Sequence, residues 1–375
     1  MKVEIITRHS VPNYGSLLQS YATQKVIENI GAEVEIINYT RYDERGKNLV
    51  NSLLNGKKWN KNFVTRTIYK MIQIPNYLIM YKKFKKYRKT FLKESKLEYG
   101  NLQELQENIP IADVYCSGSD QIWGRIGNVD YDEAYFLGFV NDERKKCIAY
   151  SSSFGKEKID VNLENKLNEL LKKYSDLLVR EDTAKEILKR HGFNNVEQVL
   201  DPTFLLNRAQ WEELANKYKN KYKKYILVYQ LHDNKKFDKY AKEFSKKTGL
   251  KLLRISPSIY HIIRSGKLIY LPNQYEFLTL FKDAEYVLTD SFHATVFSII
   301  FNKEFINILP GKTSTRITSI LKLVGLQNRV LDNYNDFSFI NKKIDFSNCN
   351  KKIEIEREKS LKMLKNAIIS RKENK

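Results

Sequence analysis

The chain has 375 residues, 42% of them hydrophobic, and carries a formal net charge of +21. This length predicts about two globular domains, and no apolar run approaches the roughly 18 residues that a membrane-spanning helix needs. Because no apolar signal segment follows Met1, we expect a cytoplasmic protein. The cysteines lack metal-ligand spacing, and no nucleic-acid-binding motif accompanies the positive charge, so neither a zinc site nor nucleic-acid binding is expected.

Short β-branched segments alternate with amphipathic helices along the first half of the chain, a pattern typical of parallel sheets with crossover helices. The helix after the first strand carries Leu18, Ala22 and Val26 on one face, and Gly31 is expected to end it. The predicted strands of this half are Val3–Thr7, Val34–Asn38, Asp113–Cys116, Cys147–Tyr150, Leu177–Val179 and Val196–Leu200.

A basic segment interrupts this alternation. From Lys57 to Lys96, thirteen Lys and Arg residues accompany one acid, Glu94, so the segment holds +12 (13 − 1) of the net +21. Aromatic and apolar residues recur at helical spacing from Tyr77 to Phe91. We therefore expect a basic helical insertion over about residues 50–100. It is either a solvated helix whose aromatic stripe packs on its own domain, or an arm that binds an anionic membrane surface.

A second run of strands and helices follows residue 205. We expect two facing, doubly wound Rossmann-like domains, the first over residues 1–205 and the second over residues 206–345. Residues 346–375 keep apolar positions at helical spacing and are expected to form a closing helix and tail. The predicted strands of the second domain are Tyr225–Gln230, Leu250–Ile255, Lys267–Leu271, Glu285–Thr289 and Phe305–Leu309.

Polar clusters follow several predicted strands of the first domain, at the strand ends where open α/β sheets bind ligands. They are Arg8–Ser16, Ser117–Trp123 and Ser151–Gly155, and Arg180 follows a further strand. Arginine offers a planar, permanently charged group that suits a carboxylate or a phosphate. Each cluster also has a plain structural interpretation as a helix cap, a turn or a surface ion pair.

Two more clusters lie in the second domain. His293 stands where the strand Glu285–Thr289 gives way to a helix, so it is either a catalytic acid or base or a histidine that caps the helix. Gly311–Arg316 is the other cluster, and Arg316 is either an anion ligand or a surface residue of the next helix. Together the clusters favour a pocket for an anionic small molecule and a polyhydroxylated partner.

Motifs of several common enzyme classes are absent from the sequence. There is no Walker A loop, no Gly-x-Gly-x-x-Gly after the first strand, no Gly-x-Ser-x-Gly, no His-Glu-x-x-His and no Cys-x-x-Cys. None of the polar clusters demands a metal.

Taken in order, these clusters resemble the polysaccharide pyruvyl transferase family. No single motif is decisive, but the series follows one order from Asn13 to about Arg329. The matching segments are Asn13–Gly15 with Gln19, Gly118–Trp123, Ser153–Gly155, Val179–Glu181, Val199–Thr203, Asp290–Ala294, Arg316 with Leu321 and Gly325–Leu326, and the helical segment Phe84–Arg88.

This resemblance implies a glycosyltransferase-B-like pair of Rossmann-like domains, with phosphoenolpyruvate as donor substrate and no bound cofactor. A pyruvyl group would pass to sugar hydroxyls of a cell-surface polysaccharide, such as an exopolysaccharide or capsule, or to its lipid-linked oligosaccharide precursor. The product would be a pyruvate ketal, and phosphate would be released. The basic segment would then hold the enzyme at the inner face of the cytoplasmic membrane.

The resemblance also implies roles for individual residues. His293 would be the acid or base, with Asp120 as a second catalytic group, and Arg180 would bind the carboxylate or phosphate of the donor. Further donor ligands are expected at Arg316, Ser291 and Ser153. The acceptor or substrate is expected to contact Asn13, Gly15, Gln19, Ser119, Gln121, Trp123 and Asp290.

The chain departs from the family pattern at one position. Better known members carry an arginine two residues before the histidine, where this chain has Ser291. Arg316, Arg8 or a lysine could take over donor binding. Two alternatives stay open for the whole chain: a nucleotide-sugar-dependent glycosyltransferase of the same architecture, and a catalytically inactive relative that binds a glycan or an anion.

Overall fold

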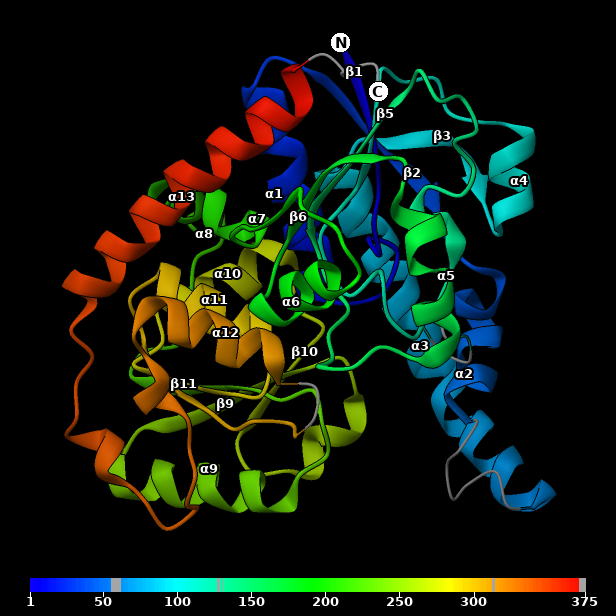
Figure 1. Cartoon of the computed structure of the whole chain (residues 1–375). Coiled ribbons are helices and arrows are strands. Elements are labelled where there is room, and N and C mark those ends of the chain that lie inside the picture. Colours follow the sequence, from blue (N-terminus) through cyan, green and yellow to red (C-terminus); the bar gives the residue numbers. More distant parts are fainter. Residues whose placement is uncertain (55–61, 127–128, 130, 312–313, 371–375) are drawn as a thin grey trace. The chain divides into compact units, whose positions relative to one another are not determined.

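The chain folds into two compact units, which are described separately below. The structure, a computed structural model, describes residues 1–54, 62–126, 129, 131–311 and 314–370 (Figure 1). Unit 1 comprises Met1–Leu205 together with the C-terminal segment from Glu356, and unit 2 comprises Leu206–Ile355.

Unit 1 is built on a seven-stranded sheet in the order β3-β2-β1-β4-β5-β6-β7, with all neighbouring strands parallel. The inner strand β5 is buried along its whole length, as expected for a strand of a parallel sheet with both faces covered. The strands are β1 (Lys2–Ile6), β2 (Glu33–Tyr39), β3 (Glu94–Tyr99), β4 (Val114–Ser117), β5 (Lys146–Ser152), β6 (Tyr174–Val179) and β7 (Val196–Gln198).

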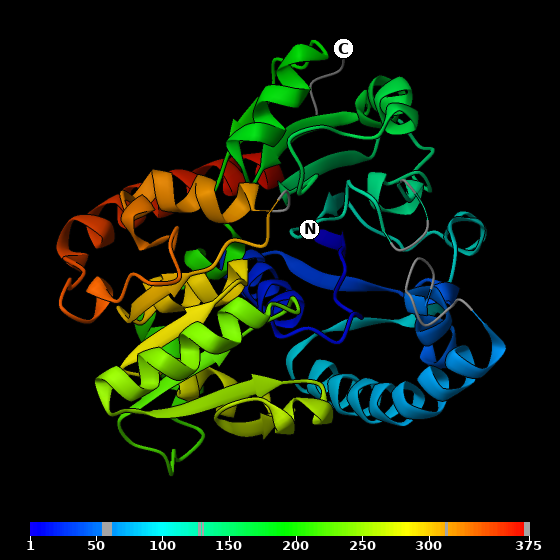
Figure 2. The same cartoon turned by 90° about the horizontal axis from the view of Figure 1, so that it is seen from below.

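Strand β3 corrects the sequence analysis, which placed residues 94–99 inside the helical insertion. Helices α2 (Gly46–Leu54) and α3 (Phe63–Phe91) form in that segment and lie side by side (Figure 2), but the chain then returns and pairs with β2. Leu97 on this edge strand is 57% exposed and Tyr99 is buried. An edge strand that buries few side chains carries little of the apolar signal that marks a central strand.

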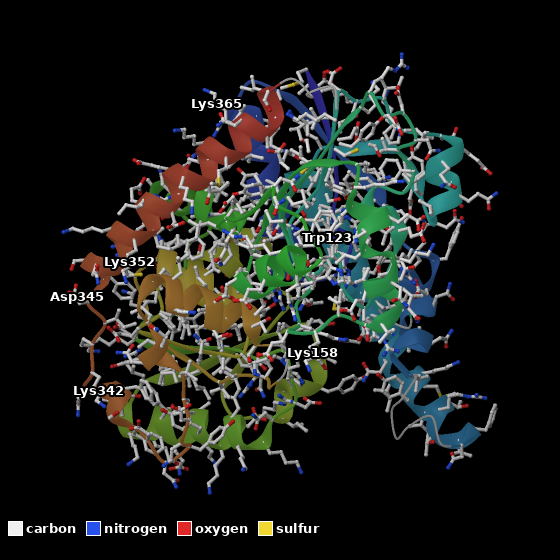
Figure 3. The ribbon with its side chains drawn as sticks, viewed as in Figure 1. Trp123, Lys158, Lys342, Asp345, Lys352 and Lys365 are labelled. Carbon is white, nitrogen blue, oxygen red and sulfur yellow. The ribbon has the colours of Figure 1, made fainter. Side chains whose placement is uncertain are left out.

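The other helices of unit 1 are α1 (Tyr14–Asn29), α4 (Leu102–Glu107), α5 (Val161–Leu171), α6 (Asp182–Arg190) and α7 (Pro202–Leu205). Helices α4, α5 and α6 bury apolar side chains in a core that contains Trp123, Tyr135, Phe136 and Phe154. Trp123 lies inside unit 1 among the side chains of this core (Figure 3).

Unit 2 repeats the architecture with a five-stranded parallel sheet in the order β10-β9-β8-β11-β12. Its strands are β8 (Tyr225–Tyr229), β9 (Lys251–Ser256), β10 (Lys267–Tyr270), β11 (Tyr286–Thr289) and β12 (Glu304–Asn307). Its helices are α8 (Arg208–Ala215), α9 (Lys235–Thr248), α10 (Gln274–Lys282), α11 (Phe292–Ile300) and α12 (Thr315–Val324).

The long helix α13 (Phe346–Ile369) begins in unit 2 and continues in unit 1, so the division at Ile355 falls inside this helix. Its second part is tied to unit 1 by hydrogen bonds. The backbone N–H of Leu200 donates to Ser360 Oγ at 3.0 Å, and Arg357 Nε donates to the carbonyl of Phe204 at 2.6 Å. The C-terminal segment that was expected as a separate closing helix therefore packs on the first unit.

Both sheets reverse their strand order at one point, between β1 and β4 in unit 1 and between β8 and β11 in unit 2. Ligands of open α/β sheets bind beyond the carboxyl ends of the strands at such points. We call the loops that follow β1, β4, β5 and β6 the unit 1 edge, and the loops that follow β8, β9, β11 and β12, with the helix starts they lead into, the unit 2 edge. Predicted site residues lie at both.

Candidate active site

The unit 1 edge begins with the loop that joins β1 to α1. Asn13 caps α1, because its backbone is extended and its side-chain oxygen accepts the backbone N–H of Gly15 at 2.7 Å. In the first turn of the helix, Ser16 donates its hydroxyl to Asp120 at 2.8 Å. The start of α1 is therefore joined to the loop that follows β4.

Asp120 is held in an unusual backbone conformation. Its φ is 91°, in the left-handed region that residues other than glycine rarely adopt. One carboxylate oxygen accepts the hydroxyl of Ser16 and the other accepts the backbone N–H of Gln121 at 2.8 Å. Just before it, a Cβ at Gly118 would come within 2.9 Å of the side chain of Ile5. Close packing against β1 therefore fixes this loop and aims the Asp120 carboxylate.

Arg180 lies at the end of β6, surrounded by carboxylates. Its Nη1 is 2.9 Å from Asp201 Oδ2, its Nη2 is 3.6 Å from Asp120 Oδ1, and its Nε is 3.9 Å from Glu181 Oε2. Burial by itself lowers the pKa of Arg180, but the carboxylates outweigh it and hold this pKa above its usual value. A guanidinium neutralised in this way has little charge to offer a donor anion. Its position therefore favours a role in holding Asp120 over the predicted contact with donor.

Two serines predicted to bind substrate hold the carboxylates of this network. Ser119 Oγ donates to Asp201 Oδ2 at 3.2 Å, and Ser153 Oγ donates to Glu181 Oε1 at 2.8 Å. Both serines are fully buried. Their hydroxyls thus hold carboxylates that surround Arg180, and the substrate contacts of both serines stay predictions.

Gln19 and Trp123, predicted to contact the acceptor, are fully buried. Gln19 Nε2 donates to Thr7 Oγ1 at 3.1 Å, which ties α1 to β1. Trp123 Nε1 donates to the carbonyl of Tyr135 at 3.3 Å, and its ring stacks on Phe136. Neither position supports contact with a sugar, because both side chains are enclosed by the core.

The accessible polar groups of the unit 1 edge are fewer than the sequence predicted. Asn13, Asp120 and Gln121 keep part of their surface exposed. Gln121 packs against Gly155, whose φ is +69° and where an added Cβ would come 1.8 Å from Gln121 Nε2. The loop after β5 thus needs glycine here for Gln121 to take its place at the edge.

At the unit 2 edge, Asp290 follows β11 and braces the loop after β8. Its carboxylate accepts the backbone N–H of Leu231 at 2.7 Å and that of His232 at 2.9 Å. It also lies 3.1 Å from His232 Nδ1. The side chain of Asp290 is only 3% exposed and so offers little surface for the predicted contact with acceptor, whereas the side chain of its partner His232 is 55% exposed.

Ser291 and His293 begin helix α11. The backbone of Ser291 is extended and its Oγ accepts the backbone N–H of Ala294 at 3.5 Å, so the residue that replaces the family arginine is the helix cap. His293 lies in the first turn, where its ring meets Phe292 edge to face, and it is 7% exposed. The predicted acid or base is therefore at the unit 2 edge, at the start of a helix.

Arg316 stands at the start of α12 and lies over the ring of Phe292, with Cζ 5.6 Å from the ring centroid. The hydrogen bond with Asp290 raises the pKa of His232 and the charge of Arg316 opposes this rise, so the histidine and the arginine share one region. Lys312 and Thr313, part of the same predicted cluster, lie outside the described residues. Arg316 therefore lies over the residue that follows Ser291, the position at which the family arginine is missing.

Sequence reasoning missed a second group at the unit 2 edge. Gln230, directly after β8, accepts Arg254 Nη1 at 2.7 Å and Arg264 Nη1 at 3.3 Å through its Oε1. Asp238 offsets both charges, at 2.9 Å from Arg254 and 3.6 Å from Arg264. The position of Gln230 at a strand end could have identified it as a candidate site residue. Arg254 could not be identified in this way, because it lies within the largely apolar strand β9.

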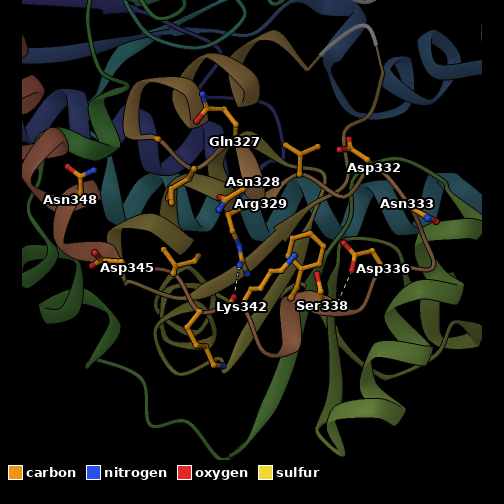
Figure 4. A pocket seen from close by; sticks show the side chains of 16 residues that line it. Gln327, Asn328, Arg329, Asp332, Asn333, Asp336, Ser338, Lys342, Asp345 and Asn348 are labelled. Carbon is orange, nitrogen blue, oxygen red and sulfur yellow. Dashed lines mark hydrogen bonds between the residues drawn. The ribbon is translucent and has the colours of Figure 1, made fainter.

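A hollow of about 730 Å³ lies elsewhere in unit 2, between the end of α12 and the start of α13 (Figure 4). Its lining residues contact both ends of β12, because Arg329 and Ile344 bond to Glu304 and Val330 pairs with Asn307. Arg329, which lines it, donates to the carbonyls of Phe305 and Lys342 at 2.9 Å each. The guanidinium of Arg329 is thus bound to backbone carbonyls. The other charged side chains that line the hollow are both acidic and basic.

Within residues 1–54, 62–126, 129, 131–311 and 314–370, no group of three or more His, Cys, Asp or Glu side chains is arranged to hold a metal ion. The cysteines Cys116, Cys147 and Cys349 are free and buried, and burial raises the pKa of the Cys116 thiol to about 12.

Solved structures share the fold of the chain. S. aureus MnaA, solved with UDP, is 14% identical with a TM-score of 0.52, and the match covers 97% of this chain and 90% of that one. The Methanocaldococcus jannaschii UDP-GlcNAc 2-epimerase is 17% identical with a TM-score of 0.49, covering 95% and 93%. The first of these likenesses, with the two parallel sheets, confirms the predicted two-domain α/β fold of glycosyltransferase-B type.

The sequence comparisons identify the family. No curated protein matches the chain. The family profile described as polysaccharide pyruvyl transferase matches residues 13–311, which is most of the chain and includes the predicted motifs from Asn13 to His293. The chain therefore belongs to the polysaccharide pyruvyl transferase family, as its sequence motifs predicted, and is a transferase.

Proposed function

We propose that the enzyme transfers a pyruvyl group from phosphoenolpyruvate to two hydroxyls of a sugar in a cell-surface polysaccharide or its lipid-linked precursor. Both hydroxyl protons leave the acceptor. One balances the proton gained by carbon 3 of the enol, which becomes a methyl group, and the other balances the proton that leaves with phosphate. The product is a cyclic ketal. Such a reaction needs an acid or base near carbon 3 and cations near the phosphate.

The observation that carries this proposal is the chemistry of the unit 2 edge in a member of this family. His293, His232 and Arg316 lie there at the start of helices or beside them. The backbone N–H groups at the start of α11 add to an environment that favours an anion. We propose that the donor binds here, with Arg316 taking over the part of the missing arginine and His293 acting as acid or base.

The unit 1 edge offers a different surface. Asn13, Asp120 and Gln121 present amide and carboxylate groups, and Arg180 is already paired with Asp120 and Asp201. Amides and carboxylates bind neutral hydroxyls better than they bind a phosphate. We propose that these three accessible side chains bind the acceptor sugar, with Asp120 as a hydrogen-bond acceptor for a reacting hydroxyl.

Donor identity can be tested by thermal unfolding of the full chain with phosphoenolpyruvate. A ligand at 100 times its Kd adds about 2.7 kcal/mol to the free energy of unfolding, which raises Tm measurably. His293→Gln should keep this rise and lower phosphate release by about 10²-fold or more. The control is His191→Gln, in unit 1 near Glu164. A rise with a nucleotide sugar and none with phosphoenolpyruvate would favour the glycosyltransferase alternative and overturn the proposal.

We propose further that α3 binds the enzyme to an anionic membrane surface, such as the inner face of the cytoplasmic membrane. None of the helices in the described residues is long and apolar enough to cross a membrane. The N-terminal half of α3 instead exposes apolar side chains, with Phe63 and Met71 each 72% exposed and Val64 63% exposed. Farther along the same outward face it exposes lysines. These are Lys82, Lys85, Lys86 and Lys89.

The opposite face of α3 anchors the helix to its own unit. Phe84 packs on Tyr14 with ring centroids 4.9 Å apart, and Arg88 donates to the carbonyl of Ser10 at 3.0 Å. Both interpretations of the basic segment therefore have a physical basis on one helix. One face packs on unit 1, and the other combines exposed apolar groups with lysines in the pattern of an interfacial helix.

Cosedimentation with vesicles tests this part of the proposal. The full chain should bind phosphatidylglycerol vesicles, release them as salt rises, and bind phosphatidylcholine weakly. Replacing the four lysines of α3 by Gln should weaken binding, at about 1 kcal/mol per lysine. The matched control replaces four exposed lysines of α13, Lys351, Lys359, Lys362 and Lys365, by Gln. Equal loss in both variants, or binding that ignores lipid charge, contradicts the proposal.

A further inference from the structure

His232 combines exposure with a firmly held ring. It lies in the loop directly after β8, at the point where the strand order of unit 2 reverses. Its side chain is 55% exposed, whereas His293 at the same edge is 7% exposed. A histidine that is both accessible and fixed can meet a ligand without ordering itself first.

Asp290 fixes the position of this ring. It accepts the backbone N–H groups of Leu231 and His232 at 2.7 and 2.9 Å, and it lies 3.1 Å from His232 Nδ1. Because a carboxylate accepts hydrogen bonds, Nδ1 carries the proton that faces Asp290. The other ring nitrogen, Nε2, is then directed away from the carboxylate.

Three charged groups act on His232. Asp290 comes from the end of β11, Arg316 from the start of α12 and Asp233 from the same loop. The hydrogen bond that His232 donates to Asp290 raises the pKa of His232, while partial burial and Arg316 oppose the rise. The imidazolium therefore persists to higher pH than an ordinary histidine allows, beside a second cation.

We propose that His232, positioned by Asp290, binds the phosphate of the donor through Nε2 and protonates it as it leaves. This inference rests on the proposed function and names a further catalytic residue for it. After carbon 3 has gained its proton and a sugar oxygen has bonded to carbon 2, the bond between carbon 2 and the bridging oxygen breaks. That oxygen keeps the electron pair and takes the Nε2 proton, and the imidazole recovers a proton from water once phosphate has gone.

The pH profile of phosphate release separates this role from a structural one. In the wild type, kcat should fall at high pH as His232 loses its proton. In His232→Gln, kcat should fall by on the order of 100-fold and the alkaline limb should disappear. Because the side chain of His232 is exposed, we expect the variant to fold, and unfolding in urea tests this. His191→Gln serves as the control and should match the wild type. An unchanged kcat and alkaline limb in His232→Gln overturn the proposal.

Binding of inorganic phosphate tests the inference without turnover. Phosphate should raise Tm of the wild type at pH 6 more than at pH 9, and His232→Gln should lose most of this rise. A wild type without such a rise, or a variant that keeps it, overturns the inference. Should phosphoenolpyruvate yield no phosphate with any acceptor while this result holds, the proposed function fails and the phosphate site stands.

Discussion

The two edges of this enzyme are built alike and are charged differently. Each lies where a parallel sheet reverses its strand order, and each has an aspartate that braces a neighbouring loop, Asp120 in unit 1 and Asp290 in unit 2. In unit 1 the arginine, Arg180, is buried among three carboxylates. In unit 2 the cations His232 and Arg316 keep part of their surface exposed.

This difference teaches that the fold places polar residues at an edge, while their pairing decides what the edge can bind. A paired and buried arginine contributes to the structure of the loops. A partly exposed histidine and arginine at the other edge can still offer charge to a ligand. This comparison is why we propose that the anionic donor binds at the unit 2 edge and a neutral, hydroxyl-bearing acceptor at the unit 1 edge.

The largest effect is expected from Arg180→Met. Removing the guanidinium leaves three carboxylates close together, two of them (Glu181 and Asp201) buried, so the free energy of unfolding should fall by about 3–5 kcal/mol. Urea unfolding measures this loss. The control is Arg190→Met, which removes an exposed arginine at the end of α6 and should change little. A variant that keeps its stability and only loses affinity for phosphoenolpyruvate would show that Arg180 binds the donor.

Arg316→Ala should weaken binding of the donor and leave the stability of the fold unchanged. The loss of one charged hydrogen-bond partner costs about 1.5–3 kcal/mol, which is a tenfold to hundredfold weaker Kd for phosphoenolpyruvate. Tm without ligand should stay close to that of the wild type. Isothermal titration gives both Kd values. Equal affinity in the two proteins would remove Arg316 from the donor site.

Ser291 tests whether the departure from the family pattern is a cap or a donor ligand. Ser291→Ala should lower the free energy of unfolding by about 1 kcal/mol, because α11 loses its N-cap. Affinity for phosphoenolpyruvate should be unchanged. The companion variant Ser291→Arg restores the family residue, and tighter donor binding in it would show that the site can accept the arginine. A loss of affinity in Ser291→Ala would contradict the capping role.

The smallest effect is expected from pH. The pKa of His232 is raised above 6.5, so its pairing with Asp290 stabilises the fold fully below about pH 6.5 and is lost as pH rises through the raised value. Burial lowers the pKa of His261 to about 4. The neutral, buried ring of His261 therefore contributes fully to the free energy of unfolding above pH 6.5, and this contribution is lost as pH falls toward 4. Urea unfolding of His232→Gln and His261→Gln across this range should show opposite trends, and parallel trends would contradict the assignment.

Most strands could be predicted from the sequence, because buried parallel strands are continuous apolar runs. β3 could not, because Glu94–Tyr99 forms an edge strand with exposed polar positions. Its pairing with β2 depends on a chain reversal after α3 that no local pattern encodes. The helical propensity of the preceding residues extended the predicted insertion over it.

The candidate sites divide in the same way. The sequence placed Asp120, Arg180, Asp290 and His293 at strand ends, because the alternation of strands and helices fixes which residues follow each strand. It could not decide exposure. Trp123 looks the same in sequence whether it faces a sugar or a core, and only its packing against Phe136 shows the latter.

The sequence by itself determined the family, the alternation of strands and helices and the edges where chemistry is expected, because motif order and hydrophobic period are local properties of a chain. The tertiary structure decided which charges neutralise one another. The carboxylates around Arg180 come from three separate segments, and Asp290 lies 58 positions from His232. Electrostatic pairing depends on distance in space, and that distance exists only once the sheets have formed.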